Sequence, residues 1–150
     1  MGNSLSENLV VEAEPSPDDT RRLDESIYAF NVQVTGISDG KLFGLFLRDA
    51  DAVVIGGAHG WTWAGTCYVS TLFVPAHMRN QGHGTTLMHA VEAEARSRGC
   101  EQILLRTLDF QAPEFYRRLG FKIISSVPDC PHGHHSITMV KHLNLQGRGH

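Results

Sequence analysis

A strand, an amphipathic helix and a second strand follow one another with short connections, and this order restricts the fold more than any other feature. Residues 66–74 are rich in β-branched and aromatic side chains, and residues 102–107 (QILLRT) form a second run that is apolar enough to be a buried strand. Between them, residues 84–98 carry apolar side chains at helical spacing, and Gly99 can end the helix. The apolar stripe of this helix comprises Leu87, Met88, Val91 and Ala95. Because two strands joined through a helix pair in parallel, we predict a right-handed parallel crossover.

The segments on either side of the crossover predict further strands and helices. Residues 9–13 are a short β-prone run, and Ser16 can cap a helix that we expect to reach Phe30. Residues 31–40 contain Gly and Ser and are expected to form a loop. Additional strands are predicted at residues 41–48, 52–63, 121–127 and 136–142, and a short helix at residues 113–119.

This order of elements predicts an α+β fold in which an antiparallel meander passes into a parallel crossover. We expect one domain over residues 1–150, with a mixed sheet of about seven strands and flanking helices. Glycines inside the strand-like run of residues 52–63, among them Gly60, predict a bulge or a close backbone approach. Residues 143–150 are expected to form a frayed tail.

Composition and charge exclude several classes of protein. Hydrophobic residues make up 41% and charged residues 19%, a balance typical of a globular chain. The net charge is −3 and the 13 basic residues are spread along the chain, so no nucleic-acid partner is expected. No apolar run reaches the roughly 18 residues of a membrane-spanning helix, and no secretory signal is recognisable. Because Cys67, Cys100 and Cys130 are few and widely spaced, we predict a reduced, cytoplasmic protein without a disulfide framework.

A glycine-containing turn joins the strand at residues 66–74 to the helix at residues 84–98. Gly82 and Gly84 remove side chains where the helix begins, so a ligand can approach the unpaired backbone N–H groups there. Arg79 adds a positive charge, and the turn is therefore suited to a phosphate or a pyrophosphate. The same glycines can also serve only to let the helix pack on the sheet. The turn has neither the G-x-x-x-x-G-K-[ST] nor the G-x-G-x-x-G pattern of other phosphate loops.

A second constellation lies about thirty residues further on, in the short helix at residues 113–119. Tyr116 is in the middle of this helix, where its ring can be buried while its hydroxyl points inward. A phenol with a pKa near 10 can protonate a leaving thiolate whose pKa is near 8.5. An ordinary core tyrosine is the alternative interpretation of this residue.

Taken together, the two segments resemble the GNAT family of acetyl-CoA-dependent N-acetyltransferases, most closely its small single-domain bacterial members. Residues 79–84 (RNQGHG) match the R/Q-x-x-G-x-G/A signature, and residues 109–121 are similar to the second motif, N-x-x-A-x-x-x-Y-x-x-x-G-F. The resemblance covers about residues 17–142. It implies a splayed mixed sheet in which the strands at residues 66–74 and 102–107 part, with acetyl-CoA, a co-substrate, in the gap.

The resemblance also implies which residues hold the coenzyme. Strand-like hydrogen bonds to the acetyl and pantetheine chain are expected from Leu72, Phe73 and Val74. The pyrophosphate is expected on backbone amides of the turn, namely those of Arg79, Asn80, Gln81, Gly82, His83, Gly84 and Thr85. Tyr116 matches the family tyrosine near the coenzyme sulfur, the candidate general acid. Because an amine attacks a thioester directly, no metal and no covalent enzyme intermediate are expected, and Cys67 is interpreted as a packing residue.

Two positions depart from the family pattern. Ser70 stands where close relatives have an acid that accepts a proton, and a serine can at most position a water molecule there. The general base is therefore unassigned, with His59, Asp109 and the histidines of residues 132–135 as alternatives. Asp109 replaces the motif asparagine, which contacts the pantetheine or the sheet backbone in the family. An ionised Asp cannot donate a hydrogen bond in that contact, whereas the amide of Gln111 can.

A histidine-rich loop and several aromatic residues have open roles. Metal ligation is one interpretation of Cys130, His132, His134 and His135, and a loop on the substrate side is the favoured one. Trp61, Trp63 and Tyr68 either line the acceptor pocket or only pack within the sheet.

Three functions compete for this sequence. The first is an N-acetyltransferase that transfers acetyl from acetyl-CoA to a primary amine of a small molecule or a peptide. Since no acidic patch is visible, a polycationic acceptor such as an aminoglycoside or a polyamine is not favoured. The second is a catalytically weak GNAT-fold module that senses acyl-CoA, and the third is a metal-binding regulator built on the histidines. The resemblance is also compatible with a homodimer.

Overall fold

The computed structural model describes residues 9–144, and the chain divides into two compact units, residues 1–37 and 38–150. The described part of the first unit contains one helix, α1 (Pro17–Thr35). The side chain of Ser16 caps the helix by accepting a hydrogen bond from the backbone N–H of Asp18 at 3.2 Å. Gly36, with a left-handed φ of 74°, ends the helix and donates its N–H to the carbonyl of Val32 at 2.7 Å.

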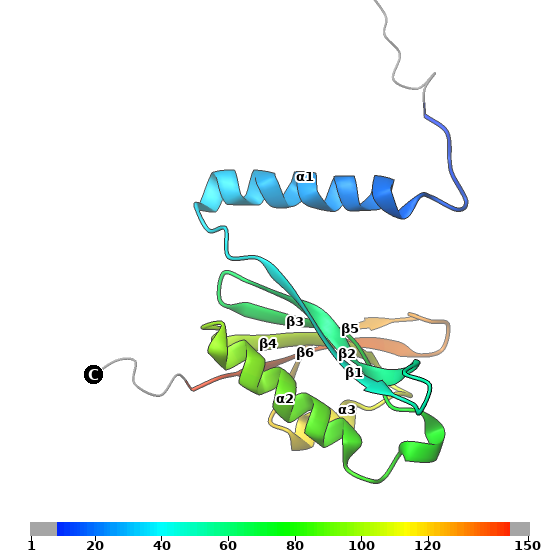
Figure 1. Ribbon diagram of the computed structural model, residues 1–150. Helices are drawn as coiled ribbons and strands as arrows, with labels where there is room; N and C mark the ends of the chain where they lie inside the picture. The colour runs from blue at the N-terminus through cyan, green and yellow to red at the C-terminus, as the bar shows by residue number, and fades with distance from the viewer. Residues whose placement is uncertain (1–8, 145–150) are drawn as a thin grey trace, which may run out of the picture. The chain divides into compact units, whose positions relative to one another are not determined.

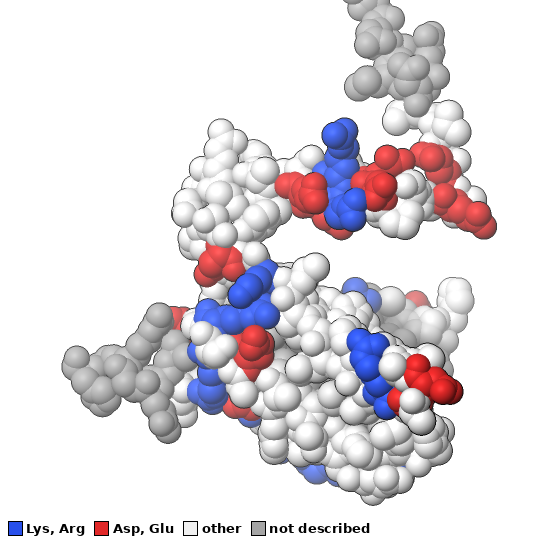
Figure 2. Space-filling view, in the orientation of Figure 1, with Lys and Arg blue, Asp and Glu red and all other residues white. Residues whose placement is uncertain are grey.

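The helix α1 continues beyond the predicted end at Phe30. The expected loop at residues 31–40 was wrong for residues 31–35, because Gly36 is the first residue after Phe30 that adopts a left-handed backbone without steric cost. Along α1, basic side chains lie between acidic ones, as Figure 2 shows. Arg21 forms ion pairs with Asp18 and Glu25, each about one helical turn away.

The second unit contains one mixed sheet of six strands in the order β1-β2-β3-β4-β6-β5 (Figure 1). Its strands are β1 (Lys41–Arg48), β2 (Val54–Trp63), β3 (Thr66–Phe73), β4 (Gln102–Leu108), β5 (Lys122–Pro128) and β6 (His135–His142). The pairing of β3 with β4 is parallel, and all other neighbours are antiparallel. The parallel crossover and the antiparallel meander are thus confirmed. The sheet has one strand fewer than expected, since residues 9–13 form no strand.

Two helices, α2 (His83–Ser97) and α3 (Pro113–Arg118), lie on the same face of this sheet (Figure 1). The predicted apolar stripe of α2 is buried in full. It packs with buried residues of the central strands, including Ile103, Leu105 and Met139, each at most 1% exposed. Phe115 and Tyr116 of α3 join the same cluster. The core therefore holds both helices firmly against β3, β4 and β6.

The predicted irregularity in the glycine-containing strand is a β-bulge between β2 and β3. His59 pairs with Thr71 and Gly60 pairs with Val69, so Ser70 has no opposite residue on β2. A Cβ atom on Gly60 would lie 1.9 Å from the carbonyl oxygen of Tyr68, which only a glycine avoids. The bulge bends β3 at Ser70.

The first residue of the predicted frayed tail, residues 143–150, is held by the core. Leu143, the first residue of the predicted frayed tail, is 6% exposed, and its N–H donates to the carbonyl of Glu101 at 2.8 Å. The prediction of fraying was wrong at Leu143, because this apolar side chain reaches the core. Residues 145–150 lie outside the described residues. Within residues 9–144, no helix is long and apolar enough to cross a membrane.

Candidate active site

The parallel strands β3 and β4 part halfway along their length. They are paired from Thr66 with Gln102 to Val69 with Leu105, and not beyond. After this point β3 stays with β2, while β4 stays with β6 as far as Leu108. The bulge at Ser70 coincides with the parting point, which explains how β3 can turn away without losing its other partner. The inner edges of the two strands therefore face each other with their backbone groups unpaired.

A cleft of about 790 Å³ opens between the parted strands, a volume typical of small-molecule sites. Most of the predicted site residues line it, namely Ser70, Leu72, Phe73, Val74, Arg79, Asn80, Gly82, His83, Gly84, Thr85, Gln111 and Tyr116. Two predicted residues, Gln81 and Asp109, lie outside its lining. The amide of Gln81 instead donates to the carbonyl of His77 at 3.1 Å.

The N-terminus of α2 contributes backbone donors to the cleft. No side chain caps this helix, and its first regular hydrogen bond runs from the N–H of Thr86 to the carbonyl of Gly82. Gly82 has a left-handed φ of 84° and open space around the position of a Cβ atom. A Cβ atom on Gly84, in contrast, would lie 3.2 Å from the ring of Phe115. Gly82 thus leaves the turn open at the start of α2, while Gly84 lets the helix pack against α3.

Arg79 and Tyr116 both line the cleft. The Nε of Arg79 donates to the carbonyl of Val74 at 2.9 Å, and its guanidinium lies 5.8 Å from the ring centre of Phe73. Tyr116 is 7% exposed, with its ring packed edge-on against Phe115 and Phe121. Burial raises the pKa of Tyr116 to about 12, so its phenol stays protonated at neutral pH.

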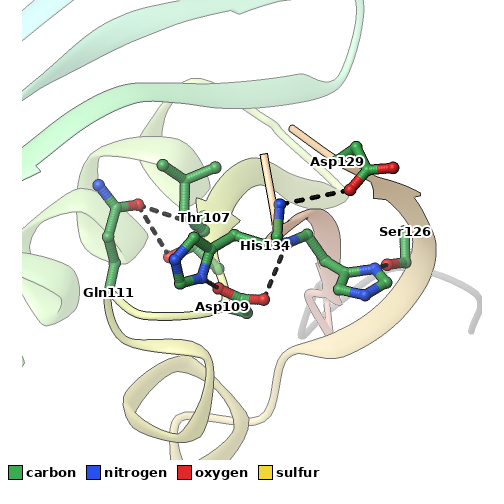
Figure 3. Close-up of polar contacts among 9 residues, drawn as sticks. Thr107, Asp109, Gln111, Ser126, Asp129 and His134 are labelled. Carbon is green, nitrogen blue, oxygen red and sulfur yellow. Dashed lines mark hydrogen bonds and ion pairs between the residues drawn. The ribbon is translucent and has the colours of Figure 1, made fainter. Parts of the chain in front are cut away.

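Asp109 binds residues of the histidine-rich loop and does not line the cleft (Figure 3). One carboxylate oxygen is 2.9 Å from Nδ1 of His134, and the other accepts the backbone N–H of His135 at 2.8 Å. Desolvation pushes the pKa of Asp109 upward, but the hydrogen bonds from His135 and His134 outweigh it and lower that pKa. The expected coenzyme contact of Asp109 stays a prediction.

Gln111 lies on the cleft side of the same segment. Its side-chain oxygen accepts hydrogen bonds from the backbone N–H of Leu108 at 2.8 Å and from the hydroxyl of Thr107 at 3.4 Å (Figure 3). Because both contacts use the oxygen, the amide nitrogen of Gln111 keeps its donors for a ligand.

The remaining residues of the histidine-rich loop are dispersed. The ring of His135 is 3.2 Å from the hydroxyl of Ser126, and the ring of His134 packs edge-on against Phe110. His132 and Cys130 are not part of these contacts. Among residues 9–144, no group of three or more His, Cys, Asp or Glu side chains is arranged to hold a metal ion.

Buried cysteines take no part in the cleft. Cys67 is 1% exposed, and burial, together with the neighbouring Cys100, raises its pKa to about 12. A thiol of this kind supplies no thiolate at neutral pH, which agrees with its interpretation as a packing residue. Cys67, Cys100 and Cys130 are all free.

No carboxylate lines the cleft within the part of the chain that the structure describes. None of the candidate proton acceptors, His59, Asp109 and the histidines of residues 132–135, is in the lining, and His59 on β2 is exposed outside it. Ser70, the candidate for positioning a water molecule, does line the cleft. Trp61 and Tyr68 stack with ring centres 5.4 Å apart, also outside the lining.

Sequence reasoning missed several lining residues, including Arg106, Phe110, Phe115 and Arg118. Phe110, Phe115 and Arg118 flank the predicted Gln111 and Tyr116, so closeness along the chain was an available signal. Arg106 could not be found in this way, because its position depends on where β3 and β4 part.

Comparison with known proteins gives a consistent assignment. A family model described as the acetyltransferase (GNAT) family matches residues 7–121. Acetyltransferase Atu2258 of Agrobacterium fabrum is 34% identical over 134 residues, which cover 89% of this chain and 97% of the relative. Blasticidin-S acetyltransferase of Streptomyces morookaense is 42% identical over 84 residues, 55% of this chain and 60% of the relative.

Solved structures share the fold. A crystal structure from Agrobacterium tumefaciens has a TM-score of 0.80 at 31% identity and covers 90% of this chain and 98% of its own. An aminoglycoside 6′-N-acetyltransferase complexed with coenzyme A has a TM-score of 0.57 at 22% identity, with 76% and 78% covered. At that identity the second likeness concerns the fold alone.

Proposed function

Because this chain belongs to the GNAT family of acetyltransferases and is thus an acyltransferase, we propose that it transfers acetyl from acetyl-CoA directly to a primary amine of a small molecule or a peptide. The family match runs across both units, which supports the further proposal that residues 1–150 act as a single domain. Use of acetyl-CoA is supported by the complex of coenzyme A with an enzyme of the same fold. A small-molecule acceptor is supported by the relative named blasticidin-S acetyltransferase.

The observation that carries the proposal is the parting of β3 from β4. The inner edge of β3 beyond Val69 has free backbone donors and acceptors, and the edge runs along the cleft toward the N-terminus of α2. An extended pantetheine chain can pair with such an edge as an additional strand would. The uncapped amides at the start of α2, with Arg79 beside them, suit the pyrophosphate. One cleft therefore suits both the pantetheine chain and the pyrophosphate of the coenzyme.

The chemistry needs few groups from the protein. The amine nitrogen attacks the thioester carbonyl carbon, so that a C–N bond forms and the C–S bond breaks. A backbone N–H of the β3 edge near Ser70 can stabilise the oxyanion, as a preorganised donor does in acyl transfer. The proposed role of Tyr116 is to donate a hydrogen bond to the sulfur as it leaves.

The acidity of the Tyr116 phenol limits how it can act. A phenol with a pKa of about 12 is protonated at neutral pH, yet it is a weaker acid than a thiol with a pKa near 8.5. Complete proton transfer to the thiolate is therefore unfavourable, and the phenol stabilises the leaving sulfur by hydrogen bonding. The proposed acceptor of the proton released by the amine is water, since no carboxylate of residues 38–144 lines the cleft and the histidine in the lining, His83, is at the start of α2 where the phosphates are expected.

A thiol-release assay tests the proposal. The purified protein is mixed with acetyl-CoA and a panel of amino acids, peptides, polyamines, aminoglycosides and arylamines, and free thiol is followed. Release that depends on the amine supports the proposal, and mass spectrometry of the product identifies the acetylated nitrogen. Binding of CoA by calorimetry without any amine-dependent release would refute the proposed reaction. Absence of CoA binding would refute the assignment of the cleft.

A further inference from the structure

Arg106 lies at the point where the two central strands part. The last pair of the parallel ladder joins Val69 to Leu105, so Arg106 and Ser70 are the first residues on either side of the opening. Both line the cleft. If the proposed function is correct, the thioester is next to this point, and Arg106 is therefore close to the reacting carbon.

The side chain of Arg106 points away from the helices. Along β4, Ile103, Leu105 and Thr107 are at most 4% exposed and face the core on the side of α2. Side chains alternate between the two faces of a strand, so the exposed Arg106 projects from the opposite face. The coenzyme phosphates are expected at the start of α2, on the helix side. An acceptor that approaches the thioester from the other side of the sheet meets Arg106.

Within residues 38–144, the described part of the second unit, the guanidinium of Arg106 forms no hydrogen bond or ion pair. Arg79, by contrast, is engaged with Val74 and Phe73. No Asp or Glu of residues 38–144 lines the cleft, so no carboxylate in the lining of the second unit neutralises Arg106. A guanidinium that projects into a ligand cleft without a partner is suited to bind a carboxylate through two parallel hydrogen bonds.

We propose that Arg106 determines specificity by binding a carboxylate of the acceptor, so that the acceptor class is an amine that also carries a carboxylate, as amino acids do. This inference rests on the proposed function. A carboxylate held by Arg106 orients the amine toward the thioester carbonyl, which is the positioning that acyl transfer requires. A polycation is disfavoured at the same place, because its charge has the same sign as Arg106.

Paired acceptors test the proposal. Each pair consists of an amino acid and its amide, such as glycine with glycinamide and phenylalanine with phenylalaninamide. The variants are Arg106→Gln and, as a matched control, Arg117→Gln, because Arg117 lies outside the cleft lining and pairs with Glu114 at 3.1 Å. We expect the wild-type protein to prefer the acid by about 10- to 100-fold in kcat/KM, as charged hydrogen bonds provide. Arg106→Gln should lose this preference through KM, while the KM for acetyl-CoA and the rates with amides stay unchanged.

Other outcomes overturn the inference. Equal loss with acids and amides, or a raised KM for acetyl-CoA alone, would place Arg106 in the coenzyme site. A wild-type preference for amides, whose amines are less basic and more often uncharged, would show that the carboxylate is not recognised. If no amine of the panel releases thiol, the proposed function has failed. Calorimetry of the same acids and amides on the CoA-saturated protein then tests Arg106 alone, and binding of acids that Arg106→Gln does not weaken refutes it.

Discussion

The pair formed by β3 and β4 has a closed half and an open half. In the closed half, Cys67, Val69, Ile103 and Leu105 are at most 3% exposed and pack under α2. In the open half, Ser70 and Arg106 are exposed, and each strand keeps only its outer neighbour. The difference shows that the sheet opens a cleft without losing its outer pairings, because β2 and β6 still pair with the parted strands.

The closed and open halves also differ in the hydrogen bonding of the arginine that lies at each. Arg98, at the end of α2 beside the closed half, donates to the carbonyls of Lys41 and Leu42 and to the hydroxyl of Thr62. Arg106, at the open half, has no partner of this kind among residues 38–144. One guanidinium ties the helix to the sheet, and the other forms no such bond to the sheet.

The largest expected effect is in the closed half. Replacing Ile103, which is 0% exposed, by Ala should lower the free energy of unfolding by about 2–5 kcal/mol, through lost burial and a cavity. Denaturation by urea measures the change. Ile124→Ala on β5, where the side chain is 56% exposed, is the control and should cost less than about 1 kcal/mol. A similar loss in both variants would contradict the comparison.

The open half should respond in turnover rather than in stability. Tyr116→Phe should reduce kcat by about 100-fold, equivalent to about 2.7 kcal/mol of transition-state stabilisation, while CoA affinity changes little. Tyr68→Phe, in the closed half, is the control because Tyr68 pairs with Leu104 outside the cleft lining. Unchanged turnover in Tyr116→Phe would remove this phenol from the mechanism.

Two substitutions of Gly82 separate the effect of backbone strain on stability from the effect of charge on CoA binding. Gly82→Ala should cost about 1–2 kcal/mol of stability, because a φ of 84° is unfavourable for a residue with a Cβ atom. Gly82→Glu should cost a similar amount and in addition abolish CoA binding, since it places a carboxylate beside the expected phosphates. Thermal unfolding and calorimetry measure the two effects. Equal CoA affinity in both variants would mean that the phosphates bind elsewhere.

The smallest expected effect is pH-dependent and concerns Asp109. Its pKa is lower in the folded protein than the ordinary value of 3.8, so its ionised form stabilises the fold above that value. This contribution disappears as the pH falls through the lowered pKa. Unfolding of the wild type and of Asp109→Asn should therefore differ at pH 7 and converge at low pH. A difference that is independent of pH would show that the carboxylate charge has no role.

Much of the fold could be predicted because the signals are local. The stripe of α2, the cap at Ser16 and the runs of the six strands are patterns in neighbouring residues, and the structure bears them out. The end of α1 and the burial of Leu143, in contrast, could not be predicted from such local patterns. Whether a helix continues or a tail is ordered depends on which residues accept a left-handed backbone and on contacts with distant segments.

The sequence by itself determined the family, through two motifs whose spacing places a glycine turn before one helix and a tyrosine within the next. Only the tertiary structure decided where β3 and β4 part, and hence that Ser70 and Arg106 flank the opening while Asp109 holds the histidine-rich loop. The physical reason is the distance of these interactions along the chain. A motif is read from adjacent residues, whereas the parting depends on pairing with β2 and β6 and on a bulge that Gly60 permits.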